Sequence, residues 1–185
     1  MAKSCAPSAP PISTALPCPI EAVDRSKRSR SHGPPHLRPG STRAPCRSIE
    51  TAIVLSESFH VPILKRPCLK EWAPDESGIS QPEYKALETR AWTDLDYLPP
   101  SKESLGMAAS RARTCLESIG SDNPGRVVAV SGHGTLFALV LSELKGDRPS
   151  ESYKDSIGFG SAAIIEAGSG LRLVRDFTRL DAAVL

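Results

Sequence analysis

A strand–turn–helix pattern in the second half of the chain could hold a phosphate group. The run Val127-Val-Ala-Val130 is typical of a buried strand, and a Ser-Gly-His-Gly turn joins it to an expected helix. Glycines let a ligand approach the backbone, and free N–H groups at a helix start favour an anion. His133, Gly134 and Thr135 are therefore candidate phosphate-binding residues. A lone histidine in a tight turn is equally compatible with a structural role.

Two other folds use a similar turn. A nucleophile elbow centred on Ser131 would need glycine two positions earlier, where Ala129 stands. A dinucleotide-binding turn would need a third glycine where the chain has Phe137. The pattern therefore favours a phosphate beside His133 over these alternatives.

Two residues upstream could complete such a site. Arg47 lies near the start of an expected helix, and its planar guanidinium can present two N–H groups to phosphate oxygens. Glu71 follows an extended segment, and a carboxyl group held near a phosphate can stay protonated and act as a general acid. Taken singly, each residue is also compatible with a solvated surface position.

Four motifs follow one another in a definite order. They are Arg47-Ser-Ile-Glu-Thr-Ala52, Cys68-Leu-Lys-Glu-Trp72, Glu103-Ser104 ahead of a long helix containing Arg111, and a strand ending in His133-Gly134. From about Ser41 to Thr178, this order resembles the histidine phosphatase (phosphoglycerate mutase-like) superfamily.

The resemblance implies an α/β fold of three layers with a mixed central sheet. It also implies phosphomonoester hydrolysis or phosphoryl transfer, in which a histidine of an Arg-His-Gly motif attacks phosphorus and becomes phosphohistidine. Arg47 and His133, with Gly134 and Thr135, correspond to the phosphate-binding positions, and Glu71 to the proton donor. A phosphorylated small molecule is the implied partner, and neither a metal ion nor a cofactor is implied.

The nucleophile motif is not recognisable. Upstream of Arg47, His-Gly occurs only in Ser31-His32-Gly33, with no apolar strand before it, and fifteen positions separate His32 from Arg47. That interval cannot hold a loop, a helix and a strand of usual lengths. We therefore predict that the N-terminal strand and helix unit is lost or replaced and that turnover is impaired. The alternative is a catalytically inactive module that binds phosphate for regulation.

Several elements must position these residues. The sequence predicts helices over 45–60, 83–90 and 135–145, and a longer helix that has Ser101 as its N-cap and ends before Gly120. It predicts extended segments over 61–64 and 127–130. It also predicts a hairpin in which 162–166 pairs with 171–174. A strand followed by a tight loop and a helix indicates an α/β unit.

Composition limits the remaining possibilities. With 185 residues, 39% of them hydrophobic and 24% charged, the chain suits one soluble domain, and no apolar run is long enough to span a bilayer. Residues 1–45 hold seven Lys/Arg against two acids, whereas the remainder holds sixteen against nineteen. A nucleic-acid-binding domain would carry its basic excess on the folded part. Five scattered cysteines indicate reduced thiols in a cytoplasmic protein.

The N-terminal region differs from the rest. Nine of the seventeen prolines fall in residues 1–45, with many serines, so this stretch cannot bury enough apolar surface to order itself. We expect a disordered extension over 1–40 and a domain over 41–185. A transit segment and a wrong-frame translation are the alternatives for the extension. No internal repeat and no indication of oligomeric state is present.

Overall fold

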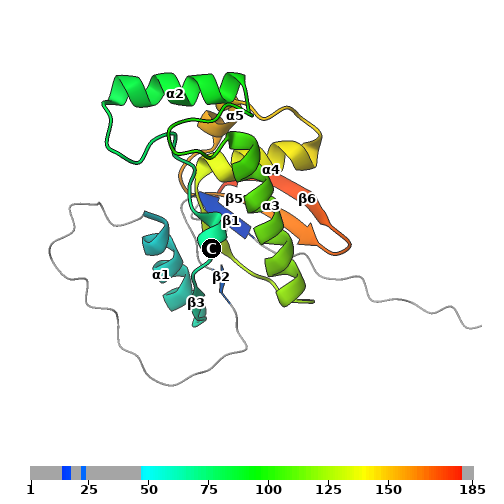
Figure 1. Cartoon of the computed structure of the whole chain (residues 1–185). Coiled ribbons are helices and arrows are strands. Elements are labelled where there is room, and N and C mark those ends of the chain that lie inside the picture. Colours follow the sequence, from blue (N-terminus) through cyan, green and yellow to red (C-terminus); the bar gives the residue numbers. More distant parts are fainter. Residues whose placement is uncertain (1–13, 18–21, 24–46, 181–185) are drawn as a thin grey trace, which may run out of the picture.

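Figure 1 shows the chain as a computed structural model, which describes residues 14–17, 22–23 and 47–180. For residues 14–17 and 22–23 and for Arg47, the structure describes the backbone but not the side chains. No helix in these ranges combines the length and apolar character that a membrane crossing needs.

A mixed sheet of six strands lies at the centre, in the order β3-β2-β4-β1-β5-β6. The strands are β1 (Thr14–Pro17), β2 (Ala22–Val23), β3 (Ile63–Leu64), β4 (Val130–Gly132), β5 (Ser161–Ala167) and β6 (Leu171–Arg179). β1 and β4 run parallel, and the other neighbours run antiparallel. The predicted mixed α/β fold and the hairpin of β5 with β6 are confirmed. The predicted strand over 127–130 is displaced, since β4 begins only at Val130 and continues to Gly132.

β1 and β2 fall inside the stretch expected to be disordered. β1 lies in the middle of the sheet, where Ala15 and Pro17 pair with Val130 and Gly132 of β4. The four residues Thr-Ala-Leu-Pro carry no recognisable strand pattern, because pairing with two neighbouring strands, rather than local propensity, makes them a strand. The other residues of the extension lie outside the described ranges, where disorder stays a prediction.

The described residues form six helical segments besides the sheet. They are α1 (Arg47–Phe59), the 3₁₀ turn η1 (Pro67–Leu69), α2 (Gln81–Thr93), α3 (Leu105–Asp122), α4 (Gly134–Lys145) and α5 (Glu151–Ser156). α4 ends as predicted at Gly146, which adopts the left-handed conformation with φ 75°. α2 begins earlier than predicted, because Ser80 and Glu83 form a capping box.

The start of α3 corrects one prediction. Its N-cap is Ser104, whose Oγ accepts a hydrogen bond from the backbone N–H of Met107 at 3.1 Å. Ser101, the predicted cap, instead donates its backbone N–H to the carbonyl oxygen of Pro74 at 3.1 Å. Both serines precede the same apolar stripe, so the pattern alone could not choose between them. The helix also continues past Gly120, to Asp122.

β4 separates two helical layers. Successive residues of a strand point to opposite faces of its sheet. Ser131 donates its hydroxyl to the carbonyl oxygen of Ser48 in α1, at 3.2 Å. Val130 belongs to the core cluster that contains residues of α3 and α4, and Gly132 packs against Phe137 of α4. α1 therefore covers one face of the sheet, while α3 and α4 cover the other.

Candidate phosphate site

His133 lies at the junction of β4 and α4. It is the N-cap residue of α4 and has extended backbone angles (φ −103°, ψ 154°). The first N–H groups of a helix have no partner within the helix, so those of α4 point toward the space around His133. Gly132 precedes it, and a Cβ atom there would lie 2.3 Å from the ring of Phe137. The glycine is thus required by the packing of Phe137, which is fully buried.

Glu71 reaches this junction from a loop that follows η1. The side chains of Leu69 and Trp72, on either side of Glu71, are fully buried and fasten the loop to the core. Glu71 Oε2 lies 3.4 Å from Nδ1 of His133, and each of these two side chains is about a quarter exposed (27% and 26%). The structure therefore brings together two of the predicted catalytic residues.

The environment of Glu71 favours its neutral form. Burial raises the pKa of its carboxyl group to about 8, and this outweighs several opposing influences. The backbone N–H groups of Trp72 and Thr135 and the positive charges of Arg111 and Lys154 all lower that pKa. A carboxyl group that keeps its proton near neutral pH has the property that a proton donor needs.

Gly134 and Thr135 open α4 beside Glu71. The Thr135 N–H interacts with the Glu71 carboxyl group, so this donor is engaged when the carboxyl group is ionised. Lys154 of α5 lies on the other side, because a Cβ atom on Gly134 would be 3.9 Å from the Lys154 side chain. Its ammonium group pairs with Glu88 of α2 at 2.9 Å. Lys154 was not predicted as a site residue, because it lies in a short polar helix without a recognisable motif.

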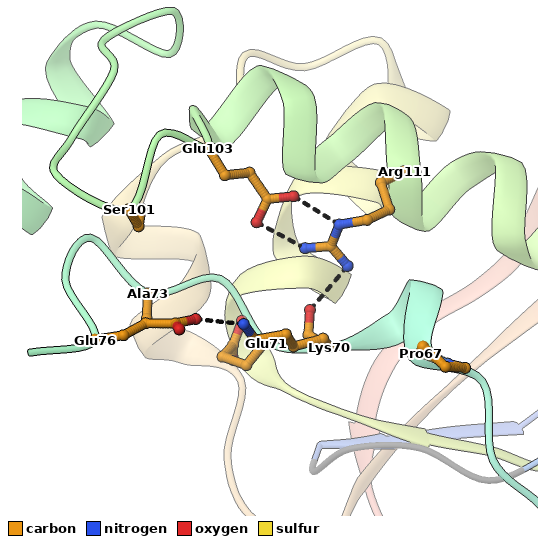
Figure 2. A pocket seen from close by; sticks show the side chains of 8 residues that line it. All are labelled: Pro67, Lys70, Glu71, Ala73, Glu76, Ser101, Glu103 and Arg111. Atoms are coloured by element: carbon orange, nitrogen blue, oxygen red, sulfur yellow. Dashed lines mark hydrogen bonds and ion pairs between the residues drawn. The ribbon is translucent and has the colours of Figure 1, made fainter.

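A hollow of about 270 Å³ lies along the Glu71 loop, and Figure 2 shows the side chains that line it. It is lined by Pro67, Lys70, Glu71, Ala73, Glu76, Ser101, Glu103 and Arg111. Two ion pairs, Lys70 with Glu76 and Arg111 with Glu103, occupy its walls. His133 does not line this hollow, so we place the candidate phosphate position at the start of α4 instead.

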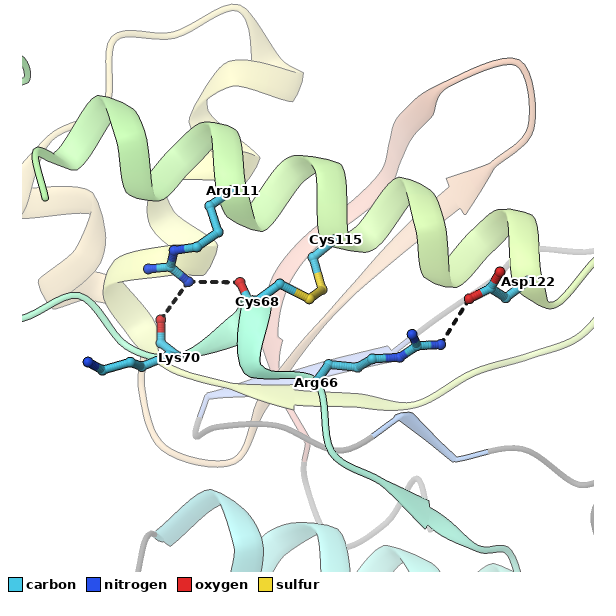
Figure 3. Close-up of a disulfide and its surroundings, with 6 residues drawn as sticks. All are labelled: Arg66, Cys68, Lys70, Arg111, Cys115 and Asp122. Atoms are coloured by element: carbon cyan, nitrogen blue, oxygen red, sulfur yellow. Dashed lines mark hydrogen bonds and ion pairs between the residues drawn. A yellow bond between two sulfur atoms is a disulfide. The ribbon is translucent and has the colours of Figure 1, made fainter.

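A disulfide joins Cys68 to Cys115, with the two Cα atoms 5.8 Å apart (Figure 3). This corrects the expectation that all cysteines are reduced thiols. The two residues are distant in the sequence and the total number of cysteines is odd, so spacing gave no sign of the pairing. The inference of a cytoplasmic location, which rested on free thiols, loses that support.

Arg47 is the first residue of α1, and its side chain lies outside the described residues. Its neighbour Ser48 accepts the hydrogen bond from Ser131, so the start of α1 lies beside the strand that leads to His133. A role for Arg47 in phosphate binding stays a prediction, as do the roles of Gly134 and Thr135. His32 lies outside the described ranges. Within them, no three His, Cys, Asp or Glu side chains gather as a metal site would require.

Arg111 makes contacts beside Glu71 that the sequence did not predict. It donates hydrogen bonds from Nη1 to the carbonyl oxygens of Cys68 and Lys70, at 2.7 and 2.9 Å. Glu103 pairs with the other side of the guanidinium group. One signal was present, since Arg111 and Cys115 are four residues apart and share a face of α3.

Solved structures with similar folds include Bacillus stearothermophilus YhfR (TM-score 0.57, 20% identity, covering 75% of this chain and 72% of that one). A mycobacterial glucosyl-3-phosphoglycerate phosphatase in complex with VO3 has a TM-score of 0.57, with 21% identity and coverage of 74% and 72%. Mycobacterial hydrolase 1 has a TM-score of 0.55, with 21% identity and coverage of 74% and 73%.

No curated protein matches the sequence. The family model described as "Histidine phosphatase superfamily (branch 1)" matches residues 45–177. This match covers more than half of the chain and includes Arg47, Glu71 and His133. The chain therefore belongs to the histidine phosphatase superfamily.

Proposed function

We propose that this chain binds phosphate monoesters of small molecules at the start of α4, beside His133, with Glu71 as the proton donor to the ester oxygen. The observation that carries the proposal is the contact of 3.4 Å between Glu71 and His133, together with the pKa of about 8 that burial gives to Glu71. The VO3 complex of a phosphatase of similar fold supports an oxyanion as ligand.

Each residue has a distinct task in this proposal. In the phosphohistidine mechanism, an imidazole nitrogen forms a bond to phosphorus while the bond from phosphorus to the ester oxygen breaks. Glu71 gives its proton to that oxygen, so that the product leaves as a neutral alcohol. His133 and the first N–H group of α4 bind the phosphoryl oxygens. Arg47 adds its guanidinium group to the same oxygens.

The proposal includes weak or absent turnover, because the nucleophile is missing from the recognisable motifs. Among the described residues the histidines are His133 and His60. His133 corresponds to the phosphate-binding position. His60 follows the last residue of α1, about 18 Å along the helix axis from Ser48, given a rise of about 1.5 Å per residue. A catalytically inactive phosphate-binding module is the second candidate function, and the lack of a recognisable nucleophile motif favours it.

Binding is tested by titrating vanadate and inorganic phosphate into the protein, followed by NMR or calorimetry. The wild type and His60→Ala should bind both anions, because His60 is exposed and distant from α4. His133→Ala should lose binding. Equal binding by wild type and His133→Ala would refute the site.

Turnover is tested separately with an aryl phosphate. Little or no release of phosphate by the folded protein is expected. Robust turnover that His32→Ala abolishes would contradict the proposed impairment and would make the N-terminal extension part of the site. Binding without turnover would favour the inactive module.

A further inference from the structure

We propose that Arg111, oriented by Glu103, is a positioning residue for Glu71, because it holds the backbone of the Glu71 loop against α3. The proposal rests on the proposed role of Glu71 as proton donor. Arg111 itself would touch neither the phosphate nor the reacting atoms.

All three nitrogens of the Arg111 guanidinium group bind protein atoms. Nε and Nη2 donate hydrogen bonds to the two carboxylate oxygens of Glu103, at 2.6 and 3.0 Å. Nη1 donates to the carbonyl oxygens of Cys68 and Lys70, at 2.7 and 2.9 Å (Figures 2 and 3). Lys70 directly precedes Glu71. The guanidinium group therefore fixes the chain one residue before the carboxyl group.

Trp72, the residue that follows Glu71, is held by the segment that contains Glu103. Trp72 donates its indole N–H to the carbonyl oxygen of Glu103 at 2.8 Å. Glu103 thus contacts the loop twice, through its side chain by way of Arg111 and through its backbone by way of Trp72. Glu71 lies between these two attachments, so its carboxyl group has little freedom to move away from His133.

The geometry requires arginine in particular. A planar fork can bind one carboxylate and two carbonyl oxygens at once, whereas an ammonium group is a single point of charge. Glu103 and Arg111 are each about a quarter exposed (28% and 25%), so the pair is partly shielded from competing water. Both residues belong to the motif that precedes and enters α3, which the phosphate site does not otherwise use.

Positioning and simple charge make opposite predictions for Glu71. The positive charge of Arg111 lowers the pKa of Glu71, so removing only a charge would raise that pKa further. Releasing the loop would instead let water reach the carboxyl group. Since burial is the main cause of the raised pKa, release would lower it toward the ordinary value of 4.5.

The test is an NMR titration of the Glu71 carboxyl carbon in ¹³C-labelled protein, assigned with Glu71→Gln. In Arg111→Lys, which keeps the positive charge but loses the planar fork, and in Arg111→Met, the pKa of Glu71 should fall by about one unit or more. Arg113→Met is the matched control. Arg113 lies on the same helix, is exposed and pairs with Glu117, so the pKa of Glu71 should not change.

An unchanged or higher pKa of Glu71 in folded Arg111→Lys would overturn the proposal, and so would a higher pKa in Arg111→Met, which is what the loss of a charge alone predicts. If Arg111→Met does not fold, the milder Arg111→Lys variant decides. The measurement needs neither ligand nor turnover. Failure of the wild type to bind phosphate would therefore refute the proposed function without affecting this result.

Discussion

Nδ1 of His133 lies 3.4 Å from Oε2 of Glu71, although the two residues belong to separate parts of the sequence. One lies at the end of a central strand, and the other lies on a loop fastened to α3. Their contact depends on the packing of Trp72 and Phe137, because these buried rings fix the loop and the strand end respectively.

The first prediction concerns pH and stability. Because the pKa of folded Glu71 is raised from 4.5 to about 8, the unfolded chain loses this proton at lower pH than the folded chain. The free energy of unfolding should therefore decrease as pH rises from about 4.5 to about 8. The decrease is a few kcal/mol at most, since one pKa unit corresponds to about 1.4 kcal/mol.

Glu71→Gln should lack this component of the pH dependence, because an amide cannot ionise. Urea denaturation at several pH values would measure it. Glu57→Gln, which changes an exposed glutamate on α1, should keep the wild-type profile. Identical profiles for wild type and Glu71→Gln would show that the carboxyl group is not protonated in the folded protein.

The second prediction concerns Gly132. An added methyl group would meet the Phe137 ring at 2.3 Å, so Gly132→Ala should destabilise the protein by about 1–3 kcal/mol and displace the turn at His133. Gly168→Ala is the matched control, because nothing lies within 4 Å of a Cβ atom there. Thermal unfolding and vanadate binding provide the two measurements. Wild-type stability of Gly132→Ala would contradict the packing described here.

The third prediction concerns Trp72. It is 2% exposed and its indole N–H binds the carbonyl oxygen of Glu103, so Trp72→Ala should cost about 3–5 kcal/mol. Leu98→Ala, at a side chain that is 61% exposed, should change stability by less than about 0.5 kcal/mol. Chemical denaturation of both variants decides. A loss below about 1 kcal/mol for Trp72→Ala would mean that this ring does not anchor the loop.

The fourth prediction concerns the disulfide. Cys68 and Cys115 are 47 residues apart, and closing a loop of this length stabilises a protein by about 2–4 kcal/mol. Dithiothreitol should therefore lower the melting temperature of the wild type. The double variant Cys68→Ser/Cys115→Ser should begin at the lower temperature and show no response. An equal response of both proteins to dithiothreitol would exclude this bond as the cause.

Much of the fold could be predicted from local patterns. α4 was predictable because an apolar run ends at Gly146, and the β5–β6 hairpin because two strand-like runs flank a glycine-rich turn. β1 was not predictable, because its four residues become a strand only through pairing with β4 and β5.

The site was predictable only in part. His133 and Glu71 were named from motif order, and the structure places their side chains in contact, while their roles stay predictions. The contacts of Arg111 could not be predicted, because two of its partners are backbone carbonyl groups, which leave no trace in residue types. The disulfide depends on a chain reversal that brings η1 against α3, and neither cysteine's neighbours in the sequence indicate that reversal.

The segment from residue 75 to residue 100, which carries α2, begins and ends beside the Glu71 loop, and Ala91 and Trp92 within it belong to the hydrophobic core. The backbone N–H of Ser101 donates to the carbonyl oxygen of Pro74 at 3.1 Å, and Trp72 binds Glu103 just beyond. The two ends of the segment are thus fixed to each other. The segment is also tied to the rest of the protein, because Trp92 is buried in the core and Glu88 pairs with Lys154 beside the site. Variation that leaves the surroundings of Glu71 intact is therefore confined to the exposed positions of this segment, where a new recognition surface could arise while the acid stays in place.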